Sequence, residues 1–543
     1  MKCRVFAAAA LFAAVALGVD GEPYRKKVIV CSWDFGNFTV ADVLSNKTAV
    51  AALPVDGVSL SALGPTLPNG KPLNPWQAFS ETNEWPKGVL EPLVPQFHEA
   101  TAIPSLRHSF TSFLLARSKK TRLDFRDYAS WARAFSNVRQ LAVLARDGGL
   151  KGLVMDPEDY GKGGQFYCHE SDPPFEETAR LARQRGREFA DAVFGEYPSM
   201  TILAFWAFSH GRQYAVQPDP REAMRRKGEL FIPFLDGMLD AMPPTAKFVD
   251  GDENSYNYSA YSLGGMTFSD KACANRACIS LVSPENREKF RAQVLIGNAM
   301  YLDRYTNKKG AFYFTGPLSG SRLHQFDENL NAALRAADEY VWLWCEKFAW
   351  IDWKVHGKPL RRIAFAEHRT WDEELPGMYD SIWAARDQRD FLDRRFPEIR
   401  GKGDCTNIMV RGTMKVTGKE QYGGRQLYRL DVKRGERYVV EYHSNKESVR
   451  GGVGFYGAQM KRQWGLPSLT VSGAGMKRIL VRIPPNTESI TLGVGKPDDG
   501  DTAEITSVGA YRLPAPTYVE EPVESAKDGA KEKKANQKKE QKK

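Results

Sequence analysis

The first 360 residues of the chain alternate between two hydrophobic patterns. Short apolar runs, typical of buried parallel strands, recur between longer segments whose apolar positions have helical spacing. The eight predicted strands are residues 27–35, 56–60, 103–108, 152–158, 200–208, 247–252, 311–315 and 340–346, and the clearest predicted helices are residues 40–53, 128–149, 174–197, 230–242, 283–305 and 330–339. This alternation predicts an α/β fold, a (β/α)8 TIM barrel over residues 25–360.

From residue 402 the pattern changes to strands alone. Short β-type runs follow one another, separated by turns rich in Gly, Asn and Pro. They are residues 407–416, 426–432, 438–443, 452–456, 477–483, 489–494 and 505–511. We therefore expect a small all-β sandwich domain over residues 402–515. Residues 361–401 contain a helical run that we expect to link the two domains and to pack on the barrel. Residues 516–543 are mostly Lys, Glu, Ala and Gln, which predicts a disordered Lys-rich tail.

The amino-terminal residues have the pattern of a secretory signal. Lys2 and Arg4 precede an unbroken apolar stretch, Val5–Leu17, and Ala16-Leu17-Gly18 fits the small-x-small cleavage rule. We predict a signal peptide over residues 1–18, a mature chain from near Val19, and a secreted or periplasmic protein. A stretch of about thirteen apolar residues is too short to span a bilayer, and no later stretch is longer, so we expect no membrane span.

The positive charge of the chain sits mainly outside the predicted domains. The formal net charge is +10, but residues 526–543 carry eight Lys against three acidic residues, and Lys2 and Arg4 lie in the predicted signal. The remainder does not favour a nucleic-acid partner.

The stretch Lys151–Tyr160 contains the best candidates for chemistry. Four apolar or small residues are followed by three carboxylates, Asp156, Glu158 and Asp159. Enzymes with parallel sheets place their chemistry at the carboxyl ends of the strands. Because side chains alternate along a strand, Asp156 and Glu158 are expected on one face. Two adjacent carboxyls do not both ionise readily, so one pKa is expected to rise, which provides an acid and a base.

Polar and aromatic residues recur at the ends of other predicted strands, which converge on one mouth in a barrel. We predict Glu158 as the general acid, Asp156 as the group that raises its pKa, and Glu346 as the second catalytic carboxylate, with Asp250 and Asp252 as alternatives to Glu346. The predicted substrate-binding residues are Asp34, Arg107, His108, Trp206, His210, Asp250, Asp252, Tyr313 and Trp344. Among them Trp206, Tyr313 and Trp344 are candidate platforms for sugar rings.

The arrangement resembles glycoside hydrolases of the TIM-barrel type. Asp156-Pro-Glu158 is similar to the end of the chitinase-type Asp-x-Glu signature, although Lys151 and Val154 stand where that pattern has two earlier Asp. Tyr428–Tyr438 resembles the strand texture of jelly-roll modules attached to glycosidases. The resemblance implies cleavage of a glycosidic bond in an oligo- or polysaccharide by two carboxyls and no cofactor. Separations of about 5–5.5 Å between them give retention, and about 6.5–9.5 Å inversion.

Other patterns and other classes of protein remain open. An α-galactosidase-like pattern would pair Asp156 with Asp250 or Asp252. A metal-dependent barrel hydrolase could use His108, Asp156, His210 and Asp250, but barrel metallohydrolases usually carry His-x-His on the first strand, which here ends in Trp33 and Asp34. A catalytically inactive barrel that binds glycans is also compatible with the pattern, because fold does not dictate function.

Cysteine spacing allows one small loop to be closed. Cys273 and Cys278 stand five residues apart in a chain that we expect to be exported. We predict a disulfide between them. We predict no metal site at this pair, because two Cys are too few ligands and no His cluster adds to them.

Overall fold

The computed structural model describes residues 26–68, 70–117, 122–160, 164–260, 267–307, 311, 313–314, 322–355, 358–359, 369–411, 414–417, 425–447, 449–463, 469–484, 486–494 and 502–514. The predicted signal peptide, the predicted mature terminus and the predicted Lys-rich tail lie outside these residues. The chain divides into two compact units, Met1–Leu302 with Asn329–Thr370 and Asp303–Glu328 with Trp371–Lys543. No helix among the described residues is long and apolar enough to cross a membrane.

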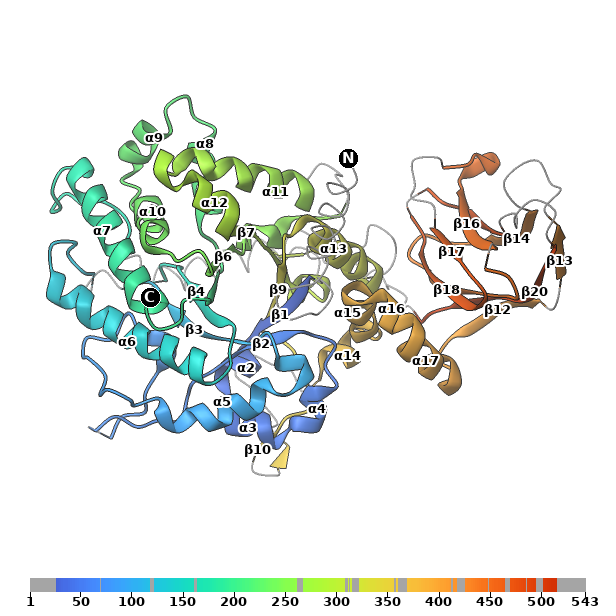
Figure 1. Ribbon diagram of the computed structural model, residues 1–543, viewed down its shortest axis with the longest axis horizontal. Helices are drawn as coiled ribbons and strands as arrows, with labels where there is room; N and C mark the ends of the chain where they lie inside the picture. The colour runs from blue at the N-terminus through green and yellow to red at the C-terminus, as the bar shows by residue number, and fades with distance from the viewer. Residues whose placement is uncertain are drawn as a thin grey trace, which may run out of the picture. The chain divides into compact units, whose positions relative to one another are not determined.

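Parallel strands form a nearly closed barrel in the first unit (Figure 1). The strands are β1 Lys27–Ser32, β2 Gly57–Leu60, β3 Phe110–Leu114, β4 Gly152–Asp156, β5 Thr201–Ala204, β6 Lys247–Asp250, β7 Val294–Ile296, β8 Asn298–Tyr301 and β9 Tyr340–Cys345. Their order is β7-β6-β5-β4-β3-β2-β1-β9-β8. Only Gly297 separates β7 from β8 along the chain, so one stretch of chain pairs with β6 through its first part and with β9 through its second.

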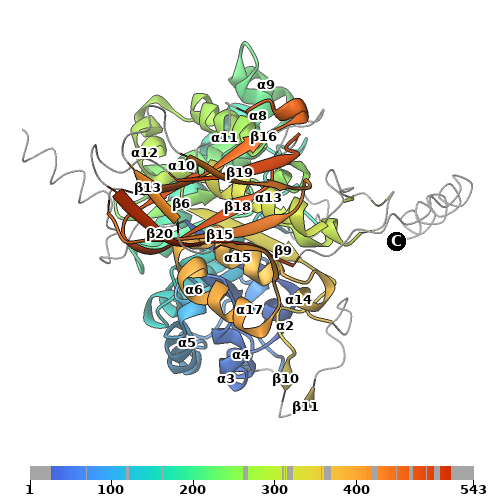
Figure 2. The ribbon, with the colours of Figure 1, turned by 90° about the vertical axis from the view of Figure 1, so that its right-hand side faces the viewer.

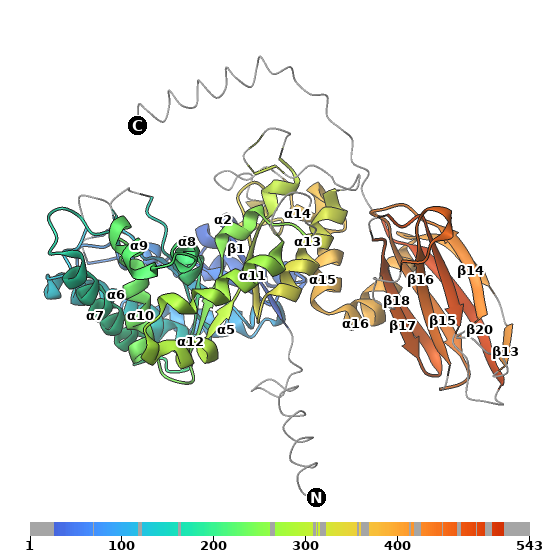
Figure 3. The ribbon, with the colours of Figure 1, turned by 90° about the horizontal axis from the view of Figure 1, so that it is seen from above.

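Helices surround these strands, as Figure 3 shows for α6, α7, α10 and α12. Their bounds are α2 Trp33–Asn37, α3 Val40–Ser45, α4 Lys47–Ala51, α5 Val94–Thr101, α6 Tyr128–Asp147, α7 Phe175–Phe194, α8 Arg212–Ala215, α9 Pro220–Lys227, α10 Phe231–Ala241, α11 Phe268–Ala277 and α12 Arg287–Gln293. A short hairpin, β10 Lys354–Val355 and β11 Lys358–Pro359, follows β9. Helix α13, Arg322–Ala336, contains the division between the two units.

Strand β4 illustrates how the sequence builds the barrel. All five of its residues are buried, as expected for a parallel strand covered on both faces. At its start Gly152 has a φ of +153°, and a Cβ there would lie 1.9 Å from the Thr201 carbonyl oxygen. Only glycine fits this close approach of β4 to β5. Strand β4 therefore ends in register with its neighbours and places Asp156 at the barrel mouth.

The third predicted strand is wrong, and two predicted site residues are misplaced with it. Residues Pro104–Leu106 form a short 3-10 helix, and β3 begins only at Phe110. Pro104 explains the difference, because its fixed φ suits the first turn of a helix and it has no N–H to donate to a strand. Arg107 and His108 thus precede β3, and the His108 N–H donates to the Asp56 carbonyl at the start of β2. Both lie at the amino end of the barrel strands, away from the mouth.

The seventh predicted strand and the helix before it are also wrong. Helix α12 ends at Gln293, and the apolar run that follows forms β7 and β8 in place of further helix. A short apolar run fits a buried helix and a buried strand equally well, so its periodicity alone misled the prediction. The described part of residues 311–315 lies outside any strand. Tyr313 is in a turn and belongs to the second unit, so it is not a barrel-strand platform.

The predicted Cys273–Cys278 disulfide does not form in the structure. Both cysteines are free, with Cys273 exposed and Cys278 buried. They lie on α11 and the 3-10 turn that continues it, where residues five apart point about 140° away from each other.

The second unit contains a sandwich of two antiparallel sheets (Figure 2). Its strands are β12 Thr406–Arg411, β13 Met414–Thr417, β14 Arg425–Asp431, β15 Arg437–Ser444, β16 Arg450–Tyr456, β17 Leu469–Ser472, β18 Gly475–Arg482, β19 Ser489–Val494 and β20 Thr502–Arg512. One sheet has the order β12-β20-β15-β18, with β13 also paired to β20, and the other has the order β14-β19-β16-β17. Alternate side chains of both sheets, such as Tyr442, Phe455 and Ile490, form a common core.

The later helices before the sandwich pack against its larger sheet. The helices of this segment are α14 Trp371–Glu374, α15 Met378–Arg386, α16 Gln388–Asp390, the π-helical turn Phe391–Arg395 and α17 Phe396–Lys402. Ala384 of α15, the π-helical turn and α17 contribute buried apolar side chains to one cluster with Val439 and Leu480 of the larger sheet. The sequence shows that this segment has an apolar face, but not which domain covers it.

A buried ion pair network stabilises the second unit. Asp327 is fully buried, with the Arg482 guanidinium 2.5 Å from one of its oxygens and that of Arg437 3.7 Å from the other. Burial alone would raise the pKa of Asp327, but the two arginines hold it below its ordinary value. The pair therefore stabilises the fold at neutral pH, and this contribution is lost as the pH falls through the lowered pKa.

We expect Asp327→Asn to destabilise the second unit by about 3–5 kcal/mol, because the buried Arg437 and the partly buried Arg482 lose their counter-charge. Denaturation of the full chain at neutral pH measures the change. Glu398→Gln is the matched control: its carboxylate is 57% exposed and pairs with Arg395 at the surface, so the change should stay within about 1 kcal/mol. Equal effects of the two substitutions would show that the buried network does not stabilise this unit.

Candidate active site

Four carboxyl groups gather at the carboxyl ends of three barrel strands. Asp156 and Glu158 come from β4, Glu253 follows β6, and Glu346 follows β9 directly. Their charges are coupled: Glu346 raises the pKa of Glu158, Glu158 raises that of Asp156, and both Glu158 and Asp156 raise that of Glu253. Asp156, Glu158 and Glu346 are three residues predicted from the sequence.

The hydroxyl of Tyr160 links the two carboxyls of β4. It lies 3.2 Å from Asp156 Oδ2 and is hydrogen-bonded to Glu158 Oε2. The Glu158 backbone N–H donates to Asp156 Oδ1 at 2.9 Å, which fixes the turn through Pro157. A phenol carries a single proton, so Tyr160 can donate to only one of the two carboxyls at a time. Both contacts of the Tyr160 oxygen are hydrogen bonds when the other carboxyl is protonated and donates to it.

Burial and mutual repulsion raise the pKa values of three of the carboxyls. The pKa of Asp156 rises to about 8, chiefly because it is buried and further because of the Glu158 charge. Burial likewise raises the pKa of Glu158, with a contribution from Glu346, while the Tyr160 hydrogen bond opposes it. The pKa of Glu253 also rises to about 8, by burial and then by the charges of Glu158 and Asp156. Since these groups titrate together, the cluster retains protons at pH 7.

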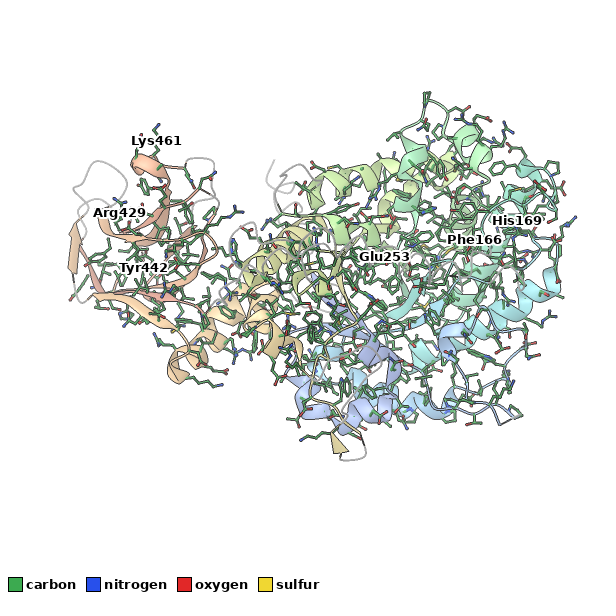
Figure 4. All side chains as sticks on the ribbon, turned by 180° about the vertical axis from the view of Figure 1, so that it is seen from behind. Phe166, His169, Glu253, Arg429, Tyr442 and Lys461 are labelled. Atoms are coloured by element: carbon green, nitrogen blue, oxygen red, sulfur yellow. The ribbon has the colours of Figure 1, made fainter. Side chains whose placement is uncertain are left out.

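Glu253 is the member that the sequence analysis missed (Figure 4). Within the described residues its side chain makes no hydrogen bond or ion pair, while its backbone N–H donates to the Phe205 carbonyl at 2.9 Å. It lies three positions after the end of β6, whereas the predicted residues Asp250 and Asp252 lie closer to the strand. Asp252, which precedes it, has a φ of +42°, and this left-handed turn directs the chain toward the mouth. Its conformation is not evident from the sequence.

Glu346 is held by hydrogen bonds to both of its oxygens. The Tyr301 hydroxyl donates to Oε2 at 3.2 Å and the Trp344 indole N–H donates to Oε1 at 3.1 Å. Trp344 in turn packs against Trp33 and Phe205, with ring centroids 6.1 and 5.9 Å away. The carboxylate is therefore fixed in one orientation, which a nucleophile or a general base requires.

Asp250, an alternative second carboxylate, is occupied by structural hydrogen bonds. It is 1% exposed and accepts from the Ala207 N–H at 3.1 Å and from the Ser209 N–H and hydroxyl, both at 2.6 Å. Burial raises its pKa to about 6 against these hydrogen bonds. Its position favours shaping the loop after β5 over contact with a substrate.

Asp252 is likewise fully buried. One of its oxygens accepts from Arg212 and Asn275, each at 2.8 Å, and from the Tyr258 hydroxyl at 3.3 Å. These bonds hold Asp252 in its left-handed conformation, which otherwise carries a cost of about 1–3 kcal/mol. Asp252 therefore positions Glu253.

Asp34 anchors the segment after β9. It is 3% exposed and accepts from the Ser32 hydroxyl, from the Trp350 N–H at 2.8 Å and from the Trp353 indole at 3.2 Å. Both oxygens of Asp34 thus accept hydrogen bonds within the protein, and its substrate-binding role stays a prediction.

Trp206 and His210 lie together in the segment after β5. Their rings stack with centroids 4.5 Å apart, and His210 Nε2 lies 3.4 Å from the buried carboxylate of Glu229. Trp206 also packs edge-on against Phe231. In the structure the Trp206 ring, predicted as a platform for a sugar, thus stacks on the His210 ring.

The residues proposed for a metal site do not assemble. His108 lies before β3, whereas Asp156 lies at the carboxyl end of β4. Across the part of the chain that the structure describes, no three His, Cys, Asp or Glu side chains are grouped closely enough to hold a metal ion.

Comparisons with known proteins give no family. No protein-family model and no curated protein match the chain. Solved structures similar to it include a glycoside hydrolase (10% identity, 88% of this chain and 94% of that chain, TM-score 0.36) and the GH20 β-N-acetylhexosaminidase of Streptomyces coelicolor A3(2) (12% identity, 59% of each chain, TM-score 0.31). The GH18 chitinase of Pseudoalteromonas aurantia (11% identity, 59% of this chain and 93% of that chain) gives a TM-score of 0.30.

A further match, to the glycosylation associate protein (Gap123) complex of Streptococcus agalactiae at 8% identity, covers 20% of this chain and 39% of that chain, with a TM-score of 0.15. At these identities and TM-scores, the likeness assigns neither a family nor an activity.

The raised pKa of Asp156 leads to a prediction about pH. The cluster keeps the Asp156 proton until about pH 8. Asp156→Asn has no carboxyl at this position that could hold the proton. If kcat/KM is plotted against pH, its fall on the alkaline side should therefore begin at a lower pH than in the wild type. Asp147→Asn, at the exposed end of α6, should leave the profile unchanged. Identical alkaline limbs in wild type and Asp156→Asn would show that Asp156 does not store the proton.

Proposed function

We propose that this protein is a glycoside hydrolase that cleaves a glycosidic bond in an oligo- or polysaccharide by carboxyl catalysis at the barrel mouth. The observation that carries the proposal is the shared Tyr160 hydroxyl, which joins a buried, proton-retaining Asp156 to the less buried Glu158. A carboxyl kept protonated at neutral pH is what protonation of a poor leaving group requires.

Glu158 acts as the general acid in this proposal. It is half-buried, whereas Asp156 is only 2% exposed, so Glu158 is the carboxyl of the pair that a substrate can reach more easily. The more deeply buried Asp156 stays protonated, and the Tyr160 hydroxyl is hydrogen-bonded to both carboxyls. As Glu158 gives up its proton, the Asp156 proton limits the negative charge that accumulates in the cluster.

Glu346 acts as the second carboxylate. Its two hydrogen bonds orient it as nucleophile or as general base. Glu253, whose pKa is raised to about 8, supplies a further protonated group facing the same space. It is the first alternative for either role, ahead of the occupied Asp250 and Asp252.

Three finer parts of the proposal rest mainly on the sequence. The barrel is of the (β/α)8 type if β7 and β8 are counted as one strand divided at Gly297. Export to the periplasm or the medium rests on residues 1–18 alone. The sandwich serves as a structural cap or as a carbohydrate-binding module.

The test is an assay of the full mature chain on a panel of aryl glycosides and oligosaccharides, with and without a chelator. We expect release of aglycone or of new reducing ends, unchanged by the chelator. Loss of activity on chelation would favour a metal-dependent hydrolase. Binding of a panel glycan without its cleavage would favour an inactive barrel.

A further inference from the structure

Exposed aromatic side chains gather in the segments that follow the barrel strands. In the described part of the first unit the exposed Trp and Tyr residues are Trp33 after β1, Trp76 after β2, Tyr160 and Tyr167 after β4, and Tyr128 on α6. Trp76 is 37% exposed and Tyr160 is 61% exposed. Their ring centroids lie 6.2 Å apart at an interplanar angle of 46°. Because the Tyr160 hydroxyl also contacts Asp156 and Glu158, the two rings lie next to the carboxyl cluster.

The loop that carries Trp76 is held rigidly by a buried arginine. Arg117, only 5% exposed, follows β3 and donates through Nε to the Phe79 carbonyl at 3.0 Å and through a terminal nitrogen to the Glu81 carbonyl at 3.0 Å. Its guanidinium also lies over the Phe79 ring, 5.3 Å from the centroid. Arg117 thus binds two backbone carbonyls of the loop.

A fully buried asparagine on α6 fastens the same loop. The Asn137 side chain accepts from the Trp85 N–H at 2.8 Å and donates to the carbonyls of Ala78 and Asn83, at 3.3 and 3.0 Å. Phe79 of the loop packs against both Trp131 and Phe135 of α6. Two buried polar side chains and one aromatic side chain therefore hold the loop, and its short 3-10 turn, Pro75–Gln77, carries the partly exposed Trp76.

An exposed tryptophan on a rigid loop is suited to binding. Covering the apolar ring of the tryptophan with a ligand removes it from water, which is favourable. Because the loop is already ordered, binding costs little conformational entropy. The C–H face of a pyranose ring is flat and apolar, and its hydroxyls point outward around the rim. Such a ring can cover Trp76 while its edge hydroxyls stay hydrated.

We propose that Trp76 and Tyr160 form an aromatic platform that binds a sugar ring adjoining the cleaved bond, so that the substrate is an extended glycan rather than a single sugar with a small aglycone. This inference rests on the proposed function. The platform holds the chain so that the neighbouring glycosidic oxygen faces Glu158. Within it, Trp76 acts on affinity and register, not on proton transfer, whereas the Tyr160 hydroxyl also contacts Asp156 and Glu158.

The test compares chain-length dependence in Trp76→Ala, Trp76→Phe and the wild type. The substrates are chito-, cello- and malto-oligosaccharides of increasing length and the aryl glycoside of the same sugar. In Trp76→Ala, the ratio of kcat/KM for chains to kcat/KM for the aryl glycoside should fall about 10- to 100-fold. Trp76→Phe should restore most of this ratio, because a smaller aromatic face remains.

Tyr128→Ala is the matched control. Tyr128 is 52% exposed on α6, where the Arg185 guanidinium lies over its ring, and this variant should keep the wild-type ratio. A Trp76→Ala variant with an unchanged ratio, or with an equal loss on every substrate, would overturn the platform. Two measurements separate the platform from the proposed function: the activity of Glu158→Gln, and the binding of the same oligosaccharides to Trp76→Ala. If Glu158→Gln stays fully active while Trp76→Ala weakens binding, the acid assignment fails and the platform stands.

Discussion

Glu158→Gln is expected to lower the hydrolysis of glycans with poor leaving groups by about 10²–10⁴-fold, the range that a general acid contributes. The amide keeps the shape of the side chain and can still meet the Tyr160 hydroxyl, but it has no acidic proton to deliver. An aryl glycoside with an activated leaving group needs little protonation, so its bond cleavage should be slowed much less. Steady-state kinetics across aryl glycosides of graded leaving-group pKa measure this difference.

The control for this experiment is Glu288→Gln. The Glu288 carboxylate is 87% exposed on α12, so the same chemical change should leave all rates unaltered. Full activity of Glu158→Gln on a natural glycan would remove the acid assignment and direct attention to Glu253. An equal loss on good and poor leaving groups would instead make Glu158 a nucleophile or a structural anchor.

Glu346→Gln is expected to reduce activity by at least about 10²-fold on good and poor leaving groups alike. A nucleophile or base acts on every substrate, whatever its leaving group. The amide has one oxygen and one NH2 group. It can therefore accept a hydrogen bond from Tyr301 or from Trp344, but not from both. Kinetics on the same series of aryl glycosides measure the loss.

Glu253→Gln is the comparison that decides the identity of the second carboxylate. If Glu346→Gln retains its activity and Glu253→Gln does not, Glu253 takes that role. Thermal denaturation of each variant accompanies the kinetics. Loss of a charge disfavoured by burial should leave Glu253→Gln at least as stable as wild type above pH 8, where wild-type Glu253 ionises.

Strands could be predicted from the sequence where the hydrophobic pattern fits a strand and does not fit a helix as well. The run before Asp156 is apolar, short and entered through Gly152, and β4 forms there. The prediction failed where periodicity is ambiguous or local chemistry intervenes: Pro104 starts a helical turn before β3, and the run after Gln293 changes from helix to strand without a breaker. The helices of residues 371–402 have an evident apolar face, but its partner is set by tertiary packing.

The site was predictable only from strand ends. The structure brings Asp156, Glu158 and Glu346 together because each stands at, or within two residues of, the carboxyl end of a barrel strand. Glu253 and Trp76 were missed because loops position them: a left-handed Asp252 turns the chain before one, and Arg117 with Asn137 fastens the loop of the other. Such contacts link residues far apart in sequence and leave no local pattern.

The most direct test of glycoside hydrolysis is cleavage of the glycan panel in ¹⁸O-labelled water by wild type and Glu158→Gln, followed by mass spectrometry of the products. The account predicts that the wild type releases fragments carrying one labelled oxygen at each new reducing end, and that Glu158→Gln releases far fewer from poor leaving groups. Unlabelled fragments with an unsaturated end, or undiminished release by Glu158→Gln, would contradict it.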